Sequence, residues 1–482
     1  MVVIIEKWLT CVAKNICKIL IARNVLFCCK YIDMMEVIKV KKGLDINLLG
    51  KADEVFPLMP EPKFYAIKPI DFQELVPKIV VKENDSVKIG TPLFFDKNRP
   101  EITIVSPVSG VVKAITRGDR RLILEVIIES DGKFESEFFH PLEIKTASSD
   151  EIKDKLLTVG AWSFIKQRPY NIIANQSVTP RDIFISGYNS APLAPNSDVV
   201  ISGKAVYLQA AIDALSKLTP GKIYLGISDR TASKVLNSLK GVRIKHFSGP
   251  HPAGNVGTQI NFIKPINKGE VVWTIQLQDL VSIGKSLLEG VFDSSRTIAI
   301  TGSSYKKPCY IHTHIGACIH PYVENKVDVA HLRYISGNVL TGTQIEPGGY
   351  LGYSDNQITV IPEGDEATFL GWAKLNYKKF SISRTFFSWM MSKREYALSA
   401  NLNGSKRAIV LSGEYDKVFP LNILPEQLIK AILAKDIDAM EQLGIYEVVE
   451  EDFALCEFID VSKLELQKIV RSGLGLMMKE LG

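Results

Sequence analysis

The stretch Gly249-Pro-His-Pro-Ala-Gly-Asn-Val-Gly-Thr-Gln-Ile-Asn-Phe262 decides how the middle of this 482-residue chain can fold. It interrupts a regular alternation of strand and helix patterns with a run rich in glycine and proline. Glycine permits backbone conformations that are closed to other residues, and proline stiffens the chain on either side. We therefore predict a tight loop that holds His251 out from the core. The loop either contacts a ligand or a partner chain, or it is a glycine- and proline-rich turn without a binding role.

On both sides of this loop, apolar strand patterns alternate with amphipathic helix patterns. The expected strands span residues 182–185, 223–227, 242–247, 271–275 and 297–300. Such an alternation implies a parallel sheet with helices on both faces, a Rossmann-like α/β domain whose ligands lie beyond the carboxyl ends of the strands. The loop follows the third of these strands and should therefore lie at that edge of the sheet.

The sequence lacks the turn that holds a dinucleotide in such domains. The first strand is followed by Ser186-Gly-Tyr-Asn-Ser190 instead of the Gly-x-Gly-x-x-Gly pattern that lets a pyrophosphate approach the backbone. Gly284-Lys-Ser286 resembles the end of a phosphate-binding loop, but Asp279 stands where that loop needs its first glycine. We therefore expect neither dinucleotide binding nor nucleotide triphosphatase activity.

Short β patterns dominate residues 35–145, where glycine, proline, asparagine and aspartate separate them. Residues 81–93 and the segment Ser106-Pro-Val-Ser-Gly-Val-Val112 resemble the paired halves of a biotinyl/lipoyl-type barrel-sandwich hybrid. In that family a lysine at the hairpin tip between the halves carries the prosthetic group. Lys97 lies between the halves here but lacks the flanking methionines of biotin carriers, so we interpret it as a solvated turn residue.

Composition excludes several classes of protein. The formal charge of +5 comes from 58 basic and 53 acidic residues without a long run of either sign, which gives no nucleic-acid surface. Four of the seven cysteines lie within the first 29 residues, and the rest of the chain has no CxxC pair. We therefore expect no disulfides and no zinc or iron–sulfur site, and we infer a reducing compartment.

Two further features allow more than one interpretation. His312 and His314 alternate on one predicted strand and could bind a metal, but no third ligand is near in sequence, so we favour exposed strand histidines. Residues 1–34 are apolar but carry charges too often for a membrane span, and no signal cleavage site follows them. They form either an amphipathic surface helix or residues upstream of a true start at Met34 or Met35, and we favour the second.

Several segments, matched in the same order along nearly the whole chain from Met35, closely resemble one family, the A subunits of sodium-translocating NADH:quinone oxidoreductases. These segments are Ile38-Lys-Val-Lys-Lys-Gly-Leu-Asp45, Ser106-Pro-Val-Ser-Gly110, Gly249-Pro-His-Pro-Ala-Gly254, Ile335-Ser-Gly-Asn-Val-Leu340, Gln357-Ile-Thr-Val-Ile-Pro-Glu-Gly364 and Ala454-Leu-Cys-Glu-Phe458. Several long matches in order are more specific than any one of them.

The resemblance implies a multi-domain α+β fold. After the extension 1–34, which the resemblance does not cover, its parts are a barrel-sandwich hybrid over 35–145, a Rossmann-like α/β domain over 146–305, a β-grasp domain over 306–365 and a mixed, then helical C-terminal domain over 366–482. The same architecture is similar to the C subunit of the Rnf complex and the NADH-binding subunit of respiratory complex I. Those relatives bind flavin, nucleotide and an iron–sulfur cluster, whereas this chain lacks the glycine loop and has Cys456 alone where several cysteine ligands would be needed.

The resemblance further implies a peripheral subunit without a transmembrane segment on the cytoplasmic face of the bacterial inner membrane. With subunits B to F it would serve electron transfer from NADH to ubiquinone coupled to sodium export, and it would not be active alone. NAD, FAD, FMN and iron–sulfur centres are expected in other subunits, with ubiquinone as a possible ligand of this chain.

Two hypotheses remain, a quinone-handling subunit or a non-catalytic scaffold whose ancestral nucleotide and iron–sulfur sites have decayed. No catalytic or metal-binding residue is expected. The residues predicted to contact quinone or another subunit of the complex are Phe247, Gly249, His251, Gly254, Gly257 and Phe262.

Overall fold

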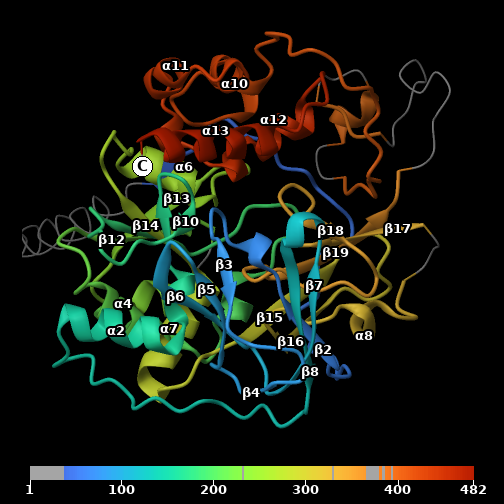
Figure 1. Ribbon diagram of the computed structural model, residues 1–482. Helices are drawn as coiled ribbons and strands as arrows, with labels where there is room; N and C mark the ends of the chain where they lie inside the picture. Colours follow the sequence, from blue (N-terminus) through green and yellow to red (C-terminus); the bar gives the residue numbers. More distant parts are fainter. Residues whose placement is uncertain are drawn as a thin grey trace, which may run out of the picture.

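The computed structural model describes residues 37–230, 233–327, 331–364, 379–382, 386–391 and 394–481 (Figure 1). The extension predicted over residues 1–34 lies outside these ranges. From the blue amino-terminal strands to the red carboxyl-terminal helices, the chain forms three sheet-containing regions and a helical one. The expected multi-domain α+β fold is confirmed.

Two small antiparallel sheets form the amino-terminal barrel-sandwich hybrid. One has the order β2 (Phe64–Ile67), β8 (Ile123–Ser130), β7 (Gly110–Arg117) and β4 (Ser86–Val87), and the other has the order β3 (Pro77–Ile79), β5 (Pro92–Asp96) and β6 (Arg99–Val105). The alternate residues Val126 and Ile128 of β8 are fully buried, as expected for a strand with one face on a core. A Cβ at Gly110, where φ is +153°, would lie 2.0 Å from the Glu129 carbonyl oxygen, so the strands meet here only because this residue is glycine. Lys97 is exposed in the turn between β5 and β6, which confirms its interpretation as a solvated turn residue.

The central sheet has the strand order β1-β13-β12-β11-β14-β9-β10. Its strands are β1 (Val37–Lys39), β9 (Lys166–Arg168), β10 (Ile172–Ile173), β11 (Ile183–Ser186), β12 (Ile223–Ser228), β13 (Arg243–Ser248) and β14 (Val272–Gln276). The four strands β11 to β14 are parallel, and their order places the reversal of winding between β11 and β14, as in Rossmann domains.

Helices cover both faces of this sheet, as expected. Ile183 and Ile185 of β11 belong to the core that also contains α4 (Ala205–Leu215) and α7 (Leu277–Glu289), whereas Phe184 between them packs with Ile260 of α6 (Val256–Ile263). The sequence Ser148-Ser-Asp-Glu151 ahead of an apolar run predicts a capping box. It is present at the start of α2 (Ser149–Val159), because Ser148 accepts from the Glu151 amide while the Glu151 carboxylate accepts from the Ser148 amide.

Two strands lie in sheets other than those we expected. β1 was expected in the small β domain, but it pairs in parallel with β13 at the edge of the central sheet, where Ile38 and Val40 pack with Phe247. The strand expected at 297–300 is β15 (Ser295–Thr301), and it leaves the Rossmann-like domain after Gly290 ends α7 in a left-handed conformation. The Rossmann-like sheet therefore ends before β15, and the predicted boundary at residue 305 lies too far along the chain.

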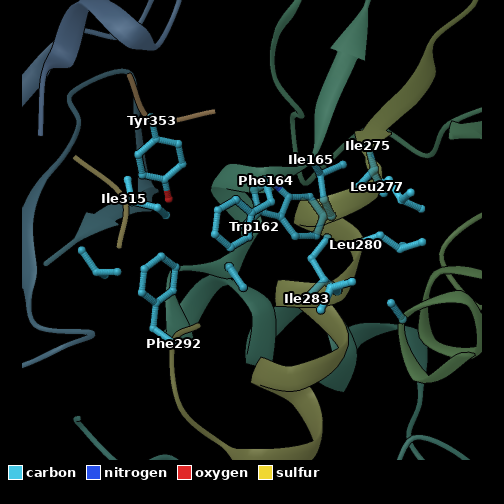
Figure 2. Packing of buried hydrophobic residues seen from close by; sticks show 14 of the residues in the cluster. Trp162, Phe164, Ile165, Ile275, Leu277, Leu280, Ile283, Phe292, Ile315 and Tyr353 are labelled. Atoms are coloured by element: carbon cyan, nitrogen blue, oxygen red, sulfur yellow. The ribbon is translucent and has the colours of Figure 1, made fainter. Parts of the chain in front are cut away.

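β15 lies in a mixed sheet of order β16-β15-β19-β17-β18. Its other strands are β16 (Cys309–His314), β17 (Leu332–Ser336), β18 (Thr343–Ile345) and β19 (Gln357–Pro362). Aromatic packing joins this sheet to the Rossmann-like domain (Figure 2), because the Phe164 ring stacks on Phe292 at 5.5 Å and lies 5.7 Å from Tyr353. The Tyr353 hydroxyl is 2.6 Å from Ser163 Oγ in the same buried region.

The carboxyl-terminal region is helical and has a core of its own. Its main helices are α10 (Pro425–Ala434), α11 (Ile437–Gln442), α12 (Ala454–Ile459) and α13 (Leu466–Leu481). Pro425 ahead of Leu428, Ile429, Ile432 and Leu433 predicts a helix start, and it occupies the first turn of α10, where its missing N–H has no helical partner in any case. Ile46 and Leu48, which follow β1, pack into this core, so the chain's first described segment connects the sheet to its last helices. No helix within the described residues is long and apolar enough to cross a membrane.

Candidate functional site

The loop after β13 folds over the carboxyl end of the parallel sheet and contacts the turn that follows β11. Residues 249–255 form the loop, and residues 256–263 continue as helix α6, so only the first half of the predicted loop is irregular. Ser186 Oγ, at the end of β11, lies 2.7 Å from the Gly254 carbonyl oxygen and accepts from Gln259 Nε2 at 3.0 Å. The loop is therefore hydrogen-bonded to the end of β11, next to the turn where a Rossmann domain holds a pyrophosphate.

Gly254 makes the closest approach to this turn. Its amide donates to Ser190 Oγ at 2.8 Å, and a Cβ at Gly254 would lie 2.5 Å from the Ser190 backbone nitrogen. Gln259 lies equally close to β12, since a Cβ at Gly226 would be 2.1 Å from Gln259 Oε1. Gly254 and Gln259 of the chain itself therefore lie against the ends of β11 and β12.

His251 is buried, with 4% of its surface exposed, so the prediction that the loop holds it out from the core is wrong. Ser190 Oγ accepts from the Gly254 amide and lies 3.0 Å from His251 Nδ1, within hydrogen-bond distance. Burial lowers the pKa of His251 from 6.5 to about 4, so the imidazole is neutral at pH 7.

The backbone of His251 ties the loop to the segment after β1. Its N–H donates to Asp45 Oδ1 at 2.8 Å, and its carbonyl accepts from the Leu44 amide at 2.8 Å. Gly43, at φ +148°, fits this contact because a Cβ there would lie 2.2 Å from the His251 carbonyl oxygen. These partners lie about 200 residues earlier in the chain, which is why the local pattern showed no sign of burial.

The two aromatic residues among the predicted contacts, Phe247 and Phe262, do not line one open pocket. Phe247 is fully buried against Val40 and Ala253, while Phe262 on α6 is 38% exposed. Gly249 is exposed at the start of the loop. Of the six predicted contact residues, only Gly249 and Phe262 are at the surface.

Helix α6 also docks onto the carboxyl-terminal region. Gly257 lies against the buried ion pair between Arg168 and Asp452, whose Nη1 and Oδ2 are 3.2 Å apart and whose side chains are 2% and 0% exposed. Asn261 Nδ2 donates to Glu447 Oε2 at 2.8 Å. The loop and α6 together therefore link β11, the segment after β1 and the helical region.

The histidines of β16 contact aromatic rings. His312 stacks on Phe56 and His314 on Phe134, each at 4.6 Å between ring centroids, and His314 Nδ1 lies 2.8 Å from Ser294 Oγ. Within the described part of the chain, no group of three or more histidine, cysteine or acidic residues is placed to hold a metal ion.

Sequence reasoning missed a cavity of about 650 Å³ between the barrel-sandwich hybrid and helices α10 and α13. Gln73 and Glu74 line it from one side and Arg471 from the other. The basic residues of α13 were the only available signal, because nothing local shows that Glu74 would face them.

The fold, together with the turn after β11, defines the class of protein. It is a multi-domain α+β protein with a barrel-sandwich hybrid and a Rossmann-like domain that has no phosphate-binding turn. Three family models match in order along the chain: the NqrA N-terminal barrel-sandwich hybrid domain over residues 38–131, the NqrA second alpha/beta domain over 147–292 and the NQRA C-terminal domain over 297–346. The boundary between the last two falls before β15, in agreement with the sheet topology.

Whole proteins match as well. The A subunit of the Na(+)-translocating NADH-quinone reductase of Rhodopirellula baltica is 34% identical over 454 residues, which cover 92% of this chain and 99% of that protein. The proteins of the same name from Yersinia pestis and Tolumonas auensis are also 34% identical, covering 92% and 90% of this chain and 100% and 98% of theirs. The chain belongs to the family of Na(+)-translocating NADH-quinone reductase A subunits.

Proposed function

We propose that this chain is the peripheral A subunit of a membrane complex that transfers electrons from NADH to ubiquinone and exports sodium ions. The supporting observation is the 34% identity that runs through 92% of this chain and 99% of the Rhodopirellula baltica protein. Its partners would be subunits B to F, on the cytoplasmic face of the bacterial inner membrane. The chain would have no activity alone.

The nucleotides, flavins and iron–sulfur centres would belong to the other subunits. In support, Gly254 and Gln259 contact the turn after β11, the position where a Rossmann domain holds a pyrophosphate. Cys456 is fully buried and is the only cysteine of α12, so it offers one ligand where a cluster takes four.

The role of the loop stays a prediction in two forms, contact with quinone or contact with a membrane-embedded partner. Neutral, buried His251, whose Nδ1 is bonded to Ser190, is poorly placed to meet a quinone oxygen. The exposed Phe262 and Gly249 fit contact with another subunit better. The burial of this loop supports the scaffold hypothesis at this position.

The test is to delete the gene for this chain in its native host and to return a tagged copy. We expect the tagged chain to co-purify with subunits B to F and to restore sodium-stimulated quinone reduction by NADH in membranes, with an empty vector as the control. A folded chain that neither co-purifies nor restores activity would contradict the proposal. Quinone binding to the purified chain then separates quinone handling from a scaffold role.

A further inference from the structure

The hairpin that joins β7 to β8 exposes apolar side chains at its end, residues 117–125, on the surface of the barrel-sandwich hybrid (Figure 1). Leu122 and Leu124 are 57% and 40% exposed. β2 runs antiparallel to β8 and leads into the turn η1 (Pro69–Asp71), which lies against β8 and holds Ile70 at 73% exposure. Single exposed apolar side chains are ordinary, whereas a group of them at one place marks a binding surface.

Arginines flank these apolar side chains. Arg117, Arg120 and Arg121 are all exposed in the hairpin end, and Arg117 Nη1 donates to the Arg121 carbonyl oxygen at 3.3 Å. Within the part of the chain that the structure describes, neither Arg120 nor Arg121 forms an ion pair with a carboxylate. The acidic residues of the hairpin end are Asp119 and Glu125, so three arginines leave it with a net positive charge.

The backbone of the turn gives a second, independent observation. Arg120 and Arg121 have φ angles of +52° and +62°, a left-handed conformation that glycine and asparagine adopt more readily than arginine. A turn that only reversed the chain would be more stable with glycine at these positions. Two consecutive arginines in this conformation therefore indicate that their charges serve a contact outside the chain.

A membrane surface with anionic lipids matches both features of the hairpin end. Leucine and isoleucine side chains can enter the boundary between the headgroups and the acyl chains. Guanidinium groups bind phosphate oxygens through pairs of parallel hydrogen bonds, and basic residues gain from the negative potential of an anionic lipid surface. Lys68, which leads into η1, adds a further positive charge beside the hairpin end.

A protein partner fits the hairpin end less well. A stable protein interface takes about 20–30 residues from each partner around a packed apolar core. The hairpin end and Ile70 supply far fewer residues than that. Insertion into lipid needs only a few apolar side chains and no surface of matching shape, so the lipid surface is the occupant that these residues favour.

We propose that the end of the β7–β8 hairpin enters the surface of a membrane that contains anionic phospholipid, with its two leucines and Ile70 in the lipid and its three arginines at the headgroup phosphates. The inference rests on the proposed function in one respect, that the chain works at the face of a membrane. It adds which residues of the chain touch the lipid.

The test is flotation of the purified full chain with vesicles of phosphatidylcholine alone and of phosphatidylcholine mixed with phosphatidylglycerol. We expect the chain to float with the anionic vesicles and much less with the neutral ones, and added salt should weaken the binding because it screens charge. Arg120→Gln combined with Arg121→Gln should weaken binding to anionic vesicles roughly 10- to 30-fold. Leu122→Ser combined with Leu124→Ser should weaken it by a similar factor, because the apolar anchor is lost.

Two matched controls remove the same kinds of group elsewhere. Lys222→Gln combined with Lys240→Gln removes two exposed positive charges from the Rossmann-like domain, and Val206→Ser removes an apolar side chain that is 69% exposed on α4. Both should leave vesicle binding unchanged. All of these positions are at the surface, and circular dichroism checks that each variant is folded.

No flotation with anionic vesicles, or flotation that both hairpin variants leave unchanged, would overturn the proposal. Absence of flotation together with loss of co-purification with subunits B to F in a hairpin variant would make the hairpin end a protein contact instead. The vesicles contain no other subunit, so failure of the flotation test leaves the proposed function standing. A chain that floats but does not co-purify would contradict the proposed function alone.

Discussion

Replacing Gly257 by alanine should break the buried ion pair that holds the helical region on the Rossmann-like domain. A Cβ at this position would lie 2.4 Å from Arg168 Nη1 and 2.4 Å from Asp452 Oδ1. Real carbon atoms do not approach so closely, so one or both of these side chains must move. Because the two side chains are 2% and 0% exposed, neither can swing into water.

Two opposing effects set the size of the change. Alanine is favoured over glycine inside a helix by about 1 kcal/mol. Separating the partners of a buried ion pair costs about 3–5 kcal/mol, because each charge then loses its compensation. The net loss in the free energy of unfolding should therefore be roughly 2–4 kcal/mol, a large share of the stability of an ordinary domain.

Urea unfolding of the purified chain measures this loss. The matched control is Gly475→Ala in α13, where the nearest atom is the mobile end of the Glu74 side chain at 2.9 Å, so stability should stay level or rise by up to about 1 kcal/mol. Asp452→Asn combined with Gly257→Ala should cost clearly less than the sum of the two single changes, since both act on one ion pair. A Gly257→Ala protein as stable as the wild type, or strictly additive losses, would refute the reasoning.

Three further predictions concern the loop and the extension. Since burial lowers the pKa of His251 from 6.5 to about 4, the neutral ring contributes fully to stability above pH 6.5, and this contribution is lost as the pH falls toward 4. Urea unfolding at pH 7 and pH 5 should therefore show a free energy of unfolding that falls by about 2 kcal/mol less in His251→Gln than in the wild type. Gly254→Val should lower the melting temperature sharply, because its Cβ would lie 2.5 Å from the backbone nitrogen of Ser190, whereas Phe262→Ala, at a side chain that is 38% exposed, should change it little. Equal effects of the two variants would contradict the burial of Gly254 and the exposure of Phe262. Deletion of residues 1–34 should leave melting temperature and assembly unchanged, and a large drop in either would show that this extension packs on the body.

Local patterns in the sequence predicted the elements of the fold well. The alternation of strands and helices, the capping box at Ser148 and the start of α10 at Pro425 all depend on residues within a few positions of each other. The sheet that a strand joins is a tertiary property. Three residues at β1 or seven at β15 fit more than one sheet, so the pattern could not decide between the sheets.

The site was harder to predict for the same reason. Glycines and prolines correctly indicated a tight turn after β13, but they describe only what the backbone can do. The backbone of buried His251 is hydrogen-bonded to Leu44 and Asp45 from an early segment of the chain, and its ring lies beside Ser190 of another loop. The cavity beside Arg471 likewise depends on Glu74, nearly 400 residues earlier, which no pattern in α13 can indicate.

Calorimetric titration of the purified full chain with NADH tests the central claim most directly. Gly254 and Ser190 bond to each other in the turn where a pyrophosphate would lie, and Gln259 covers the end of β12. We predict no micromolar binding and no stoichiometric NADH retained by the protein. Saturable micromolar binding of one NADH per chain would show that the crevice opens, and it would contradict the conclusion that this chain leaves nucleotide chemistry to its partners.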